Sequence, residues 1–283
     1  MKKMKKYIYP ALIVLFSAIL IGSSVYLIDY FIKSKKQQDN YNELSNLVEQ
    51  VQQQQNSGGS SSGDGSDDTL ELPGTSAQSA YVEVVHPETG ETLQILREYA
   101  PIFELNPDTI GWLKIPGTLI NYPVLQTPDS PNYYLTRDFY KEKSKHGAIY
   151  ASELADIARP SDNITLYGHK MADGSMFASL HRYKDENFYK ENPYIIFDTL
   201  TTYRRYQIVA VFRTTSVVGE GFAYHDFVDG NVFTFAEFVN QCKALSFYDT
   251  GVEVNYGDKL LTLSTCDHSI SNGRFVVVAK QIY

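Results

Sequence analysis

A cysteine and an arginine lie at the ends of two successive strand-like runs near the C-terminus. The apolar run 259–266, KLLTLSTC, ends at Cys266, and Arg274 begins the run 274–280, RFVVVAK. The chain has only two cysteines in 283 residues, and catalytic groups are commonly carried where a strand gives way to a loop. A thiolate is a strong nucleophile, and a guanidinium is a permanent positive charge that can stabilise a developing oxyanion. The pair therefore predicts a nucleophilic cysteine assisted by an arginine.

Such a cysteine needs a second partner, because a thiol with an ordinary pKa of about 8.5 is mostly protonated at neutral pH. Histidine usually fills this role, as a base or as the imidazolium of an ion pair. Among the six histidines, His169 stands apart because it ends the strand-like run 163–169, NITLYGH, much as Cys266 ends its own run. A lone histidine is more often structural, so spacing favours His169 over the others without deciding its role. The others are His86, His146, His181, His225 and His268.

The elements that must position these residues are mostly strands. Runs rich in β-branched and aromatic residues, separated by Pro, Asn, Asp and Gly, predict strands at 147–150, 163–167, 194–197, 206–211, 259–265 and 274–280. Helices are predicted at 92–105 and after Asn231, where Thr234 and Glu237 have capping-box spacing. We therefore expect a mostly β, closed barrel with peripheral helices, since closure leaves no strand edge unpaired.

The second cysteine, Cys242, falls in the helix predicted after Asn231. Phe235, Phe238 and Leu245 share its helical face, so we interpret Cys242 as a small buried hydrophobic residue. A Cys242–Cys266 disulfide is the structural alternative.

The N-terminal residues predict a membrane anchor. Residues 1–6, MKKMKK, carry four lysines, and residues 7–28 are free of charge. At about 1.5 Å per residue this helix is about 33 Å long, enough for a bilayer core of about 30 Å. A cleaved signal peptide is the alternative, although its apolar region is usually about 7–15 residues. We expect a cytoplasmic N-terminus at 1–6 and a transmembrane anchor at 7–29, an orientation that the lysine distribution favours by a small margin.

Residues 30–80 are expected to connect this anchor to one globular domain at 81–283. Within this connection, an apolar stripe at helical spacing is typical of a lone juxtamembrane helix or, alternatively, of a self-association seam. The stripe consists of Leu44, Leu47, Val48 and Val51. Residues 57–68, SGGSSSGDGSDD, predict a flexible linker. The net charge of −8 argues against nucleic acid as a partner.

Several segments, taken together in this order, resemble the motifs of class B sortases. Residues 163–180, NITLYGHKMADGSMFASL, resemble the histidine motif of that family, whereas TLSTC at 262–266 and GRFVVVAK at 273–280 resemble its cysteine and arginine motifs. Residues 105–126, LNPDTIGWLKIPGTLINYPVLQ, resemble its entry segment. The resemblance covers about residues 96–283. TLxTC alone is moderately specific, and the combination is much more so.

The resemblance implies a sortase-type eight-stranded barrel and a cysteine transpeptidase without cofactor or metal. Cys266 would attack the threonine carbonyl of a C-terminal sorting signal, NPxT- or LPxT-like, and form a thioacyl enzyme. His169 would protonate the departing amine and later deprotonate the incoming one, while Arg274 would hold the substrate and stabilise the oxyanion. Ser264 lies two residues before Cys266 and so on the same strand face; it is expected either to line the substrate groove or to be a packed hydroxyl.

The resemblance also implies partners and a location. The substrates would be surface proteins that carry a sorting signal, and the acceptor would be a peptidoglycan amine, outside the membrane of a Gram-positive bacterium. A pilin-polymerising sortase would differ only in the acceptor amine. A non-enzymatic β-barrel adhesin or scaffold, with Cys266 merely buried, is an alternative of a different class. A papain-like peptidase is disfavoured, because its cysteine precedes its histidine.

Two short stretches look like sorting signals themselves. Residues 72–75 read LPGT and residues 106–109 read NPDT. A genuine signal lies near a C-terminus, ahead of an apolar span and a basic tail, and neither stretch does. We interpret the first as linker and the second as a turn in which Pro107 ends a helix.

Overall fold

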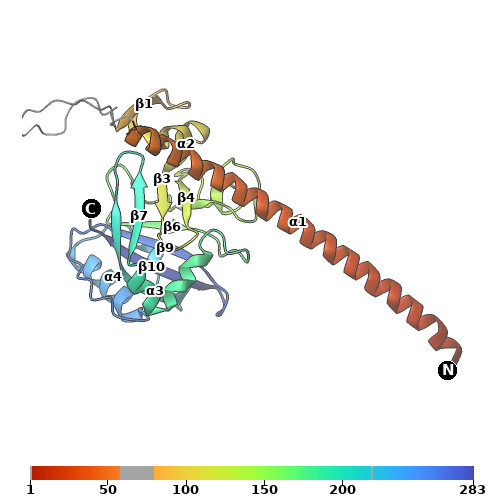
Figure 1. Cartoon of the computed structure of the whole chain (residues 1–283). Helices are drawn as coiled ribbons and strands as arrows, with labels where there is room; N and C mark the ends of the chain where they lie inside the picture. The colour runs from red at the N-terminus through yellow and green to blue at the C-terminus, as the bar shows by residue number, and fades with distance from the viewer. Residues whose placement is uncertain (1, 58–79, 218) are drawn as a thin grey trace, which may run out of the picture. The chain divides into compact units, whose positions relative to one another are not determined.

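The computed structural model describes residues 2–57, 80–217 and 219–283, and Figure 1 traces the chain. The predicted linker beyond Ser57 and the LPGT stretch at 72–75 lie outside the described residues. The chain divides into two compact units, Met1–Glu43 and Leu44–Tyr283. Both contain part of a single long helix, α1 (Lys2–Ser57).

The first unit contains the apolar part of α1. The large apolar side chains of residues 12–28 are exposed all round, among them Val14, Phe16 and Leu20 at 64–69%. The candidate span within α1, Leu12–Gln55, contains a window with mean hydropathy 2.1, none of which is buried. A helix that is apolar on every face is suited to a membrane. By length and composition this helix can cross one, a test that a signal sequence near the N-terminus also passes.

The second unit is a closed eight-stranded barrel with a two-stranded hairpin beside it, which confirms the predicted mostly β barrel. The barrel order is β10-β8-β7-β3-β4-β5-β6-β9, and the hairpin pairs β1 with β2. The hairpin strands are β1 (Tyr81–Val85) and β2 (Thr92–Leu96). The barrel strands are β3 (Thr109–Lys114), β4 (Asn121–Leu125), β5 (Ile149–Ala151), β6 (Asn163–Tyr167), β7 (Tyr194–Thr199), β8 (Arg205–Thr215), β9 (Leu260–Asp267) and β10 (Gly273–Gln281).

Helices lie outside the barrel. The hairpin and α2 (Ala100–Leu105) lie towards one end of it, and α3 (Glu186–Glu191) and α4 (Val232–Leu245) towards the other (Figure 1). The helix predicted at 92–105 is wrong over its first half, which is strand β2 and a 3₁₀ turn at Arg97–Tyr99. The reason is tertiary: Leu93 and Ile95 alternate with polar residues, and β2 pairs along its whole length with β1. Helix begins only at Ala100, with Pro101 in its first turn.

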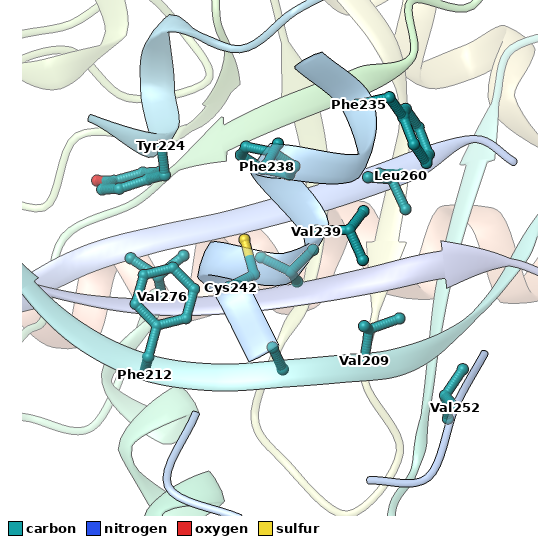
Figure 2. Packing of buried hydrophobic residues seen from close by; sticks show 12 residues of the cluster. Val209, Phe212, Tyr224, Phe235, Phe238, Val239, Cys242, Val252, Leu260 and Val276 are labelled. Carbon is teal, nitrogen blue, oxygen red and sulfur yellow. The ribbon is translucent and has the colours of Figure 1, made fainter. Parts of the chain in front are cut away.

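Helix α4 is confirmed, and its capping box lies three residues earlier than predicted, with Asn231 as the N-cap and Thr234 at the third helical position. The Asn231 side chain accepts hydrogen bonds from Phe233 N and Thr234 N, and the Thr234 hydroxyl returns a bond to Asn231 N. Figure 2 shows its apolar side chains, including Phe238, lying over strands β8, β9 and β10. Cys242 is fully buried among them and both cysteines are free, so the packing interpretation of Cys242 holds and the disulfide alternative does not.

The end of α1 belongs to the second unit and packs on the barrel. Leu44 is 0% exposed and Val48 is 5% exposed. Ser45 Oγ accepts a 2.6 Å hydrogen bond from Asn121 Nδ2 on β4, and Asn121 Oδ1 accepts one of 2.7 Å from Trp112 Nε1 on β3. The apolar stripe therefore packs against the barrel of the same chain. This differs from both the lone helix and the self-association seam expected from the sequence.

Candidate active site

The pairing of three strands brings the predicted catalytic residues to one end of the barrel wall. Strand β9 lies between β6 and β10. It runs parallel to β6, with Tyr167 opposite Ser264, and antiparallel to β10, with Arg274 directly opposite Cys266. His169 follows β6 by two residues and Cys266 follows Ser264 by two. All three residues therefore lie at the same ends of adjacent strands, as their spacing predicts.

Arg274 is directed at the sulfur of Cys266. Its Nη1 lies 4.0 Å from Cys266 Sγ and also donates to the carbonyls of Gly273 (3.1 Å) and Asn272 (3.4 Å). Directly opposed residues of paired strands carry their side chains on the same face, which explains the approach. Both side chains are half-buried. The guanidinium therefore lies where a negative charge would develop, either on the sulfur or on the oxygen of a carbonyl group whose carbon the sulfur attacks.

The imidazole of His169 is held by a hydrogen bond at Nε2. His169 Nε2 lies 2.7 Å from the backbone carbonyl oxygen of Leu135. A carbonyl oxygen only accepts, so Nε2 carries the hydrogen and Nδ1 is the basic nitrogen of the neutral ring. Gly147 packs against this ring: its φ is +59°, and an added Cβ would lie 2.7 Å from Tyr134 O and 3.1 Å from His169 Cδ2. The ring is thus fixed by backbone on two sides.

Ser264 shares the outer face of β9 with Cys266, as strand alternation predicts. It is 2% exposed, and its hydroxyl lies 2.6 Å from the hydroxyl of Tyr224, which is also buried. Of the two expectations for Ser264, a packed hydroxyl describes its geometry. Tyr224 comes from the segment between β8 and α4, and Figure 2 shows it beside the cluster that α4 covers.

Tyrosines that sequence reasoning did not single out surround the cysteine and arginine. Burial raises the pKa of Tyr224, with smaller opposing effects from Ser264 and Arg274. Burial likewise raises the pKa of Tyr150 on β5, and the charges of Arg274 and Cys266 both act on it. The ring of Tyr150 lies 5.4 Å from that of Tyr167 on β6. We call Tyr150, Tyr167 and Tyr224 the tyrosine wall. Tyr150 lies beside Tyr167 because β5 pairs with β6, and a single sequence does not show which strands pair.

The other thiol and three of the other histidines differ from Cys266 and His169 in their burial and contacts. Burial raises the pKa of the Cys242 thiol, which makes it inert. His146 is buried, with Nε2 2.8 Å from Asp173 Oδ2, and His268 is exposed. His181 contacts the backbone of Cys266 itself, with Nε2 3.1 Å from Cys266 O.

The NPDT stretch is a buried turn, as interpreted from sequence. Helix α2 ends at Leu105, and Asn106 is 1% exposed. Its Nδ2 donates to Tyr134 Oη (2.9 Å) and Phe139 O (2.7 Å). Thr109 is 2% exposed, and its hydroxyl donates to Asn106 O. A stretch locked in this way is not available as a peptide substrate.

Comparison with known proteins agrees with this geometry. The family model described as "Sortase domain" matches residues 113–282. The chain is 34% identical to sortase B of Listeria monocytogenes over 195 residues, which cover 68% of this chain and 76% of that protein. It is 32% identical to sortase B of Staphylococcus aureus over 187 residues, 65% of this chain and 75% of that protein.

A solved structure agrees as well. The Staphylococcus aureus sortase B–substrate complex superposes with a TM-score of 0.68 at 26% identity, covering 89% of this chain and 98% of that one. The fold and these matches define an enzyme of the cysteine transpeptidase class, and the chain belongs to the sortase family. Within that family its relatives place it in class B. The alternative of a non-enzymatic scaffold is therefore wrong.

Proposed function

We propose that this class B sortase uses Cys266 as its nucleophile, His169 as its acid and base, and Arg274 as its oxyanion donor. The observation that carries the proposal is the 4.0 Å approach of Arg274 Nη1 to Cys266 Sγ across paired strands. His169, at the end of the strand on the other side of β9, supports it. Cys242, the other thiol, is fully buried and protonated, so it does not compete for this role.

The reaction has two acyl transfers. Cys266, with its thiol proton held by His169, attacks as a thiolate the carbonyl carbon of the threonine in a sorting signal; a C–S bond forms, and the oxygen becomes an oxyanion beside Arg274. His169 gives its proton to the departing amine as the peptide C–N bond breaks, which leaves a thioester. His169 then takes a proton from the incoming amine, whose nitrogen attacks the thioester and releases the thiolate. Loss of one donor to an oxyanion typically costs about 3 kcal/mol in such reactions.

We further propose that the substrate is a sorting signal of the NPxT or LPxT type on a surface protein. The solved complex of a related sortase B with a substrate supports a peptide ligand for this fold. The tyrosine-rich surroundings of Cys266 supply apolar walls with polar tips, as a peptide groove needs. The proposed acceptor is a peptidoglycan amine, and a pilin lysine is the alternative that the same chemistry allows.

The proposed location is the cell membrane, with α1 as a single-pass anchor, the N-terminus in the cytoplasm and the catalytic domain outside. The unburied apolar window within Leu12–Gln55 supports an anchor. The lysine-rich start of the chain supports the orientation.

The test uses the full-length chain in detergent with fluorogenic NPxT and LPxT peptides. Each peptide is offered with a short glycine peptide, a peptidoglycan stem peptide or a lysine-containing pilin-like peptide, and products are identified by mass spectrometry. We expect cleavage after threonine, a covalent acyl adduct on Cys266 and transfer to one amine. The proposal fails if neither peptide is cleaved, or if Cys266→Ala forms the same products as the wild type.

A further inference from the structure

A second histidine contacts the backbone of Cys266. His181 Nε2 lies 3.1 Å from the carbonyl oxygen of Cys266. Because that oxygen only accepts, Nε2 must carry the hydrogen and donate it. His181 belongs to the 3₁₀ segment Ala178–Lys184, which is neither of the strands paired with β9. The contact therefore joins the cysteine-bearing strand to a separate element.

The contact replaces a bond that the barrel does not provide. The last hydrogen bond between β6 and β9 runs from Gly168 N to Ser264 O, 3.2 Å. In a parallel ladder every second carbonyl of a strand faces the same neighbour, so Cys266 O would next receive the amide of Lys170. The chain has left β6 by then, and Lys170 forms an isolated bridge with Met176 instead. His181 supplies the missing donor, at the residue that carries the thiol.

The imidazole is held so that it can serve as this donor. Its ring stacks on Phe275 of β10, with centroids 4.4 Å apart and planes 25° from parallel. Burial lowers the pKa of His181, and the charges of Lys170 and Lys184 lower it further. The hydrogen bond to Cys266 O and the charge of Asp267 act in the opposite direction without reversing the shift. The ring is thus kept neutral and oriented at neutral pH.

The same segment is tied to the catalytic histidine. Phe177 N, immediately before the 3₁₀ segment, donates a 2.9 Å hydrogen bond to the carbonyl of His169. One end of the short stretch 177–181 therefore holds the backbone of His169, and the other end holds the backbone of Cys266. The stretch 177–181 therefore connects the backbones of His169 and Cys266, which are not themselves paired in the β6–β9 ladder.

We propose that His181 is a positioning residue, which fixes the spacing of Cys266 from His169 through the carbonyl of Cys266 without touching the substrate. This inference rests on the proposed roles of Cys266 and His169. Proton transfer to the leaving amine needs both groups at hydrogen-bond range of one reacting centre, so small errors of spacing lower kcat. Binding of the peptide elsewhere in the groove does not depend on this spacing, so we expect KM to stay unchanged when His181 is replaced.

Two variants separate the effect of the His181 hydrogen-bond donor from the effect of its ring stacking on Phe275. His181→Phe keeps a flat ring to stack on Phe275 but has no donor, whereas His181→Gln loses the ring stack and keeps an N–H. The control is His268→Phe, at an exposed histidine just after Cys266. Full-length variants are compared for kcat, KM and thermal midpoint with whichever sorting peptide the wild type cleaves, and Cys266→Ala is measured in parallel.

We expect His181→Phe to lower kcat about tenfold with KM unchanged within about twofold, and His181→Gln to recover most of the loss. His268→Phe should match the wild type. The inference is overturned if His181→Phe keeps full kcat, or if His181→Gln is as slow as His181→Phe while both remain folded. Residual activity of Cys266→Ala equal to the wild type would instead sink the proposed function, so the two failures are distinguishable.

One measurement does not depend on the variants folding. Long-range ¹H–¹⁵N spectra of the histidine rings in the wild-type chain report which nitrogen carries the hydrogen. We expect the Nε2–H form for His181 at neutral pH, and an Nδ1–H form would contradict the inference.

Discussion

Arg274 and Cys266 face each other directly across the β9–β10 ladder, with the guanidinium Nη1 4.0 Å from the sulfur. Two carbonyls next to Arg274 in the chain, those of Asn272 and Gly273, accept hydrogen bonds from the same nitrogen. The cation is therefore aimed by its own hairpin loop, and its position does not depend on the substrate. Preorganised donors of this kind need no rearrangement when charge develops.

Replacing Arg274 should slow the chemistry more than it weakens binding of the peptide. We expect Arg274→Gln to lower kcat about 100-fold, because the remaining amide cannot match a charged donor to the oxyanion. Arg274→Lys should recover only part of this, since a point charge lacks the planar fork. Steady-state kinetics check this, with Arg159→Gln as control because that side chain is 93% exposed. Equal rates for Arg274→Gln and the control would contradict the assigned role.

The two thiols should differ sharply in reactivity. Cys242 is fully buried and its pKa is raised by burial, whereas Cys266 is half-buried beside a cation. We expect a disulfide reagent to modify one thiol per native chain and both thiols after denaturation. Cys266→Ala should abolish the native reaction, and Cys242→Ala should leave it intact. A native reaction that survives in Cys266→Ala would show that Cys242 is accessible.

Gly147 should be required for the position of His169. Its φ of +59° disfavours any side chain, and an added Cβ would meet Tyr134 O at 2.7 Å and Leu135 O at 2.8 Å. Leu135 O is the group that holds His169 Nε2. We expect Gly147→Ala to lower both the free energy of unfolding, by more than about 1 kcal/mol, and kcat.

A matched glycine separates backbone strain from the effect on His169. Gly90, in the β1–β2 hairpin, has a φ of +73° and nothing within 4 Å of an added Cβ. Gly90→Ala should therefore cost only the strain, about 1 kcal/mol, and leave kcat unchanged. If Gly147→Ala behaves like Gly90→Ala in both urea unfolding and kinetics, Gly147 does not position His169.

Acid should weaken the fold through Asp267, the residue after Cys266. Asp267 is 2% exposed, and burial alone would raise the pKa of its carboxyl. Hydrogen bonds from Ser269 and from Arg213 Nε, the latter 2.6 Å, outweigh this and hold the pKa well below its ordinary range. Because the folded pKa lies below the unfolded value of about 3.9, the stabilisation is complete above that value. It is lost as pH falls towards the folded pKa.

We therefore expect Asp267→Asn to unfold at lower urea concentration at pH 7, by about 2 kcal/mol of unfolding free energy. Its deficit relative to the wild type should shrink as pH falls below about 4. Urea titrations between pH 2 and pH 7 give both quantities. A deficit that stays constant across this range would mean that the charge of Asp267 contributes nothing.

Local patterns predict the positions of Cys266, Arg274 and His169 at strand ends better than they predict the residues around them. Cys266, Arg274 and His169 could be placed because each ends or begins a run whose alternation and length are visible in the chain. The tyrosine wall could not, because Tyr150 and Tyr224 approach the site through pairings between distant segments. The contact of His181 with Cys266 O has the same origin, since it depends on where β6 stops.

The two errors over helices have a similar cause. Residues 92–96 have the length and polarity to begin a helix, and only the partner strand β1 makes them extended. The stripe that includes Leu44 and Val48 has helical spacing, but such spacing shows only that one helix face is apolar and does not show what covers it. The missing information in both cases was tertiary.

The parallel pairing of β6 with β9 has a consequence for how the protein matures. The strand before His169 and the strand that carries Cys266 are far apart in the chain, and β9 and β10 are the last two strands that the structure describes. Contacts between such distant segments form late, because the entropy of closing a long loop must be overcome first. In a nascent chain Cys266 therefore meets His169 and Arg274 only after β9 and β10 have been made and have closed the barrel. The order of synthesis alone therefore keeps the thiol of Cys266 apart from Arg274 until β10 has been made.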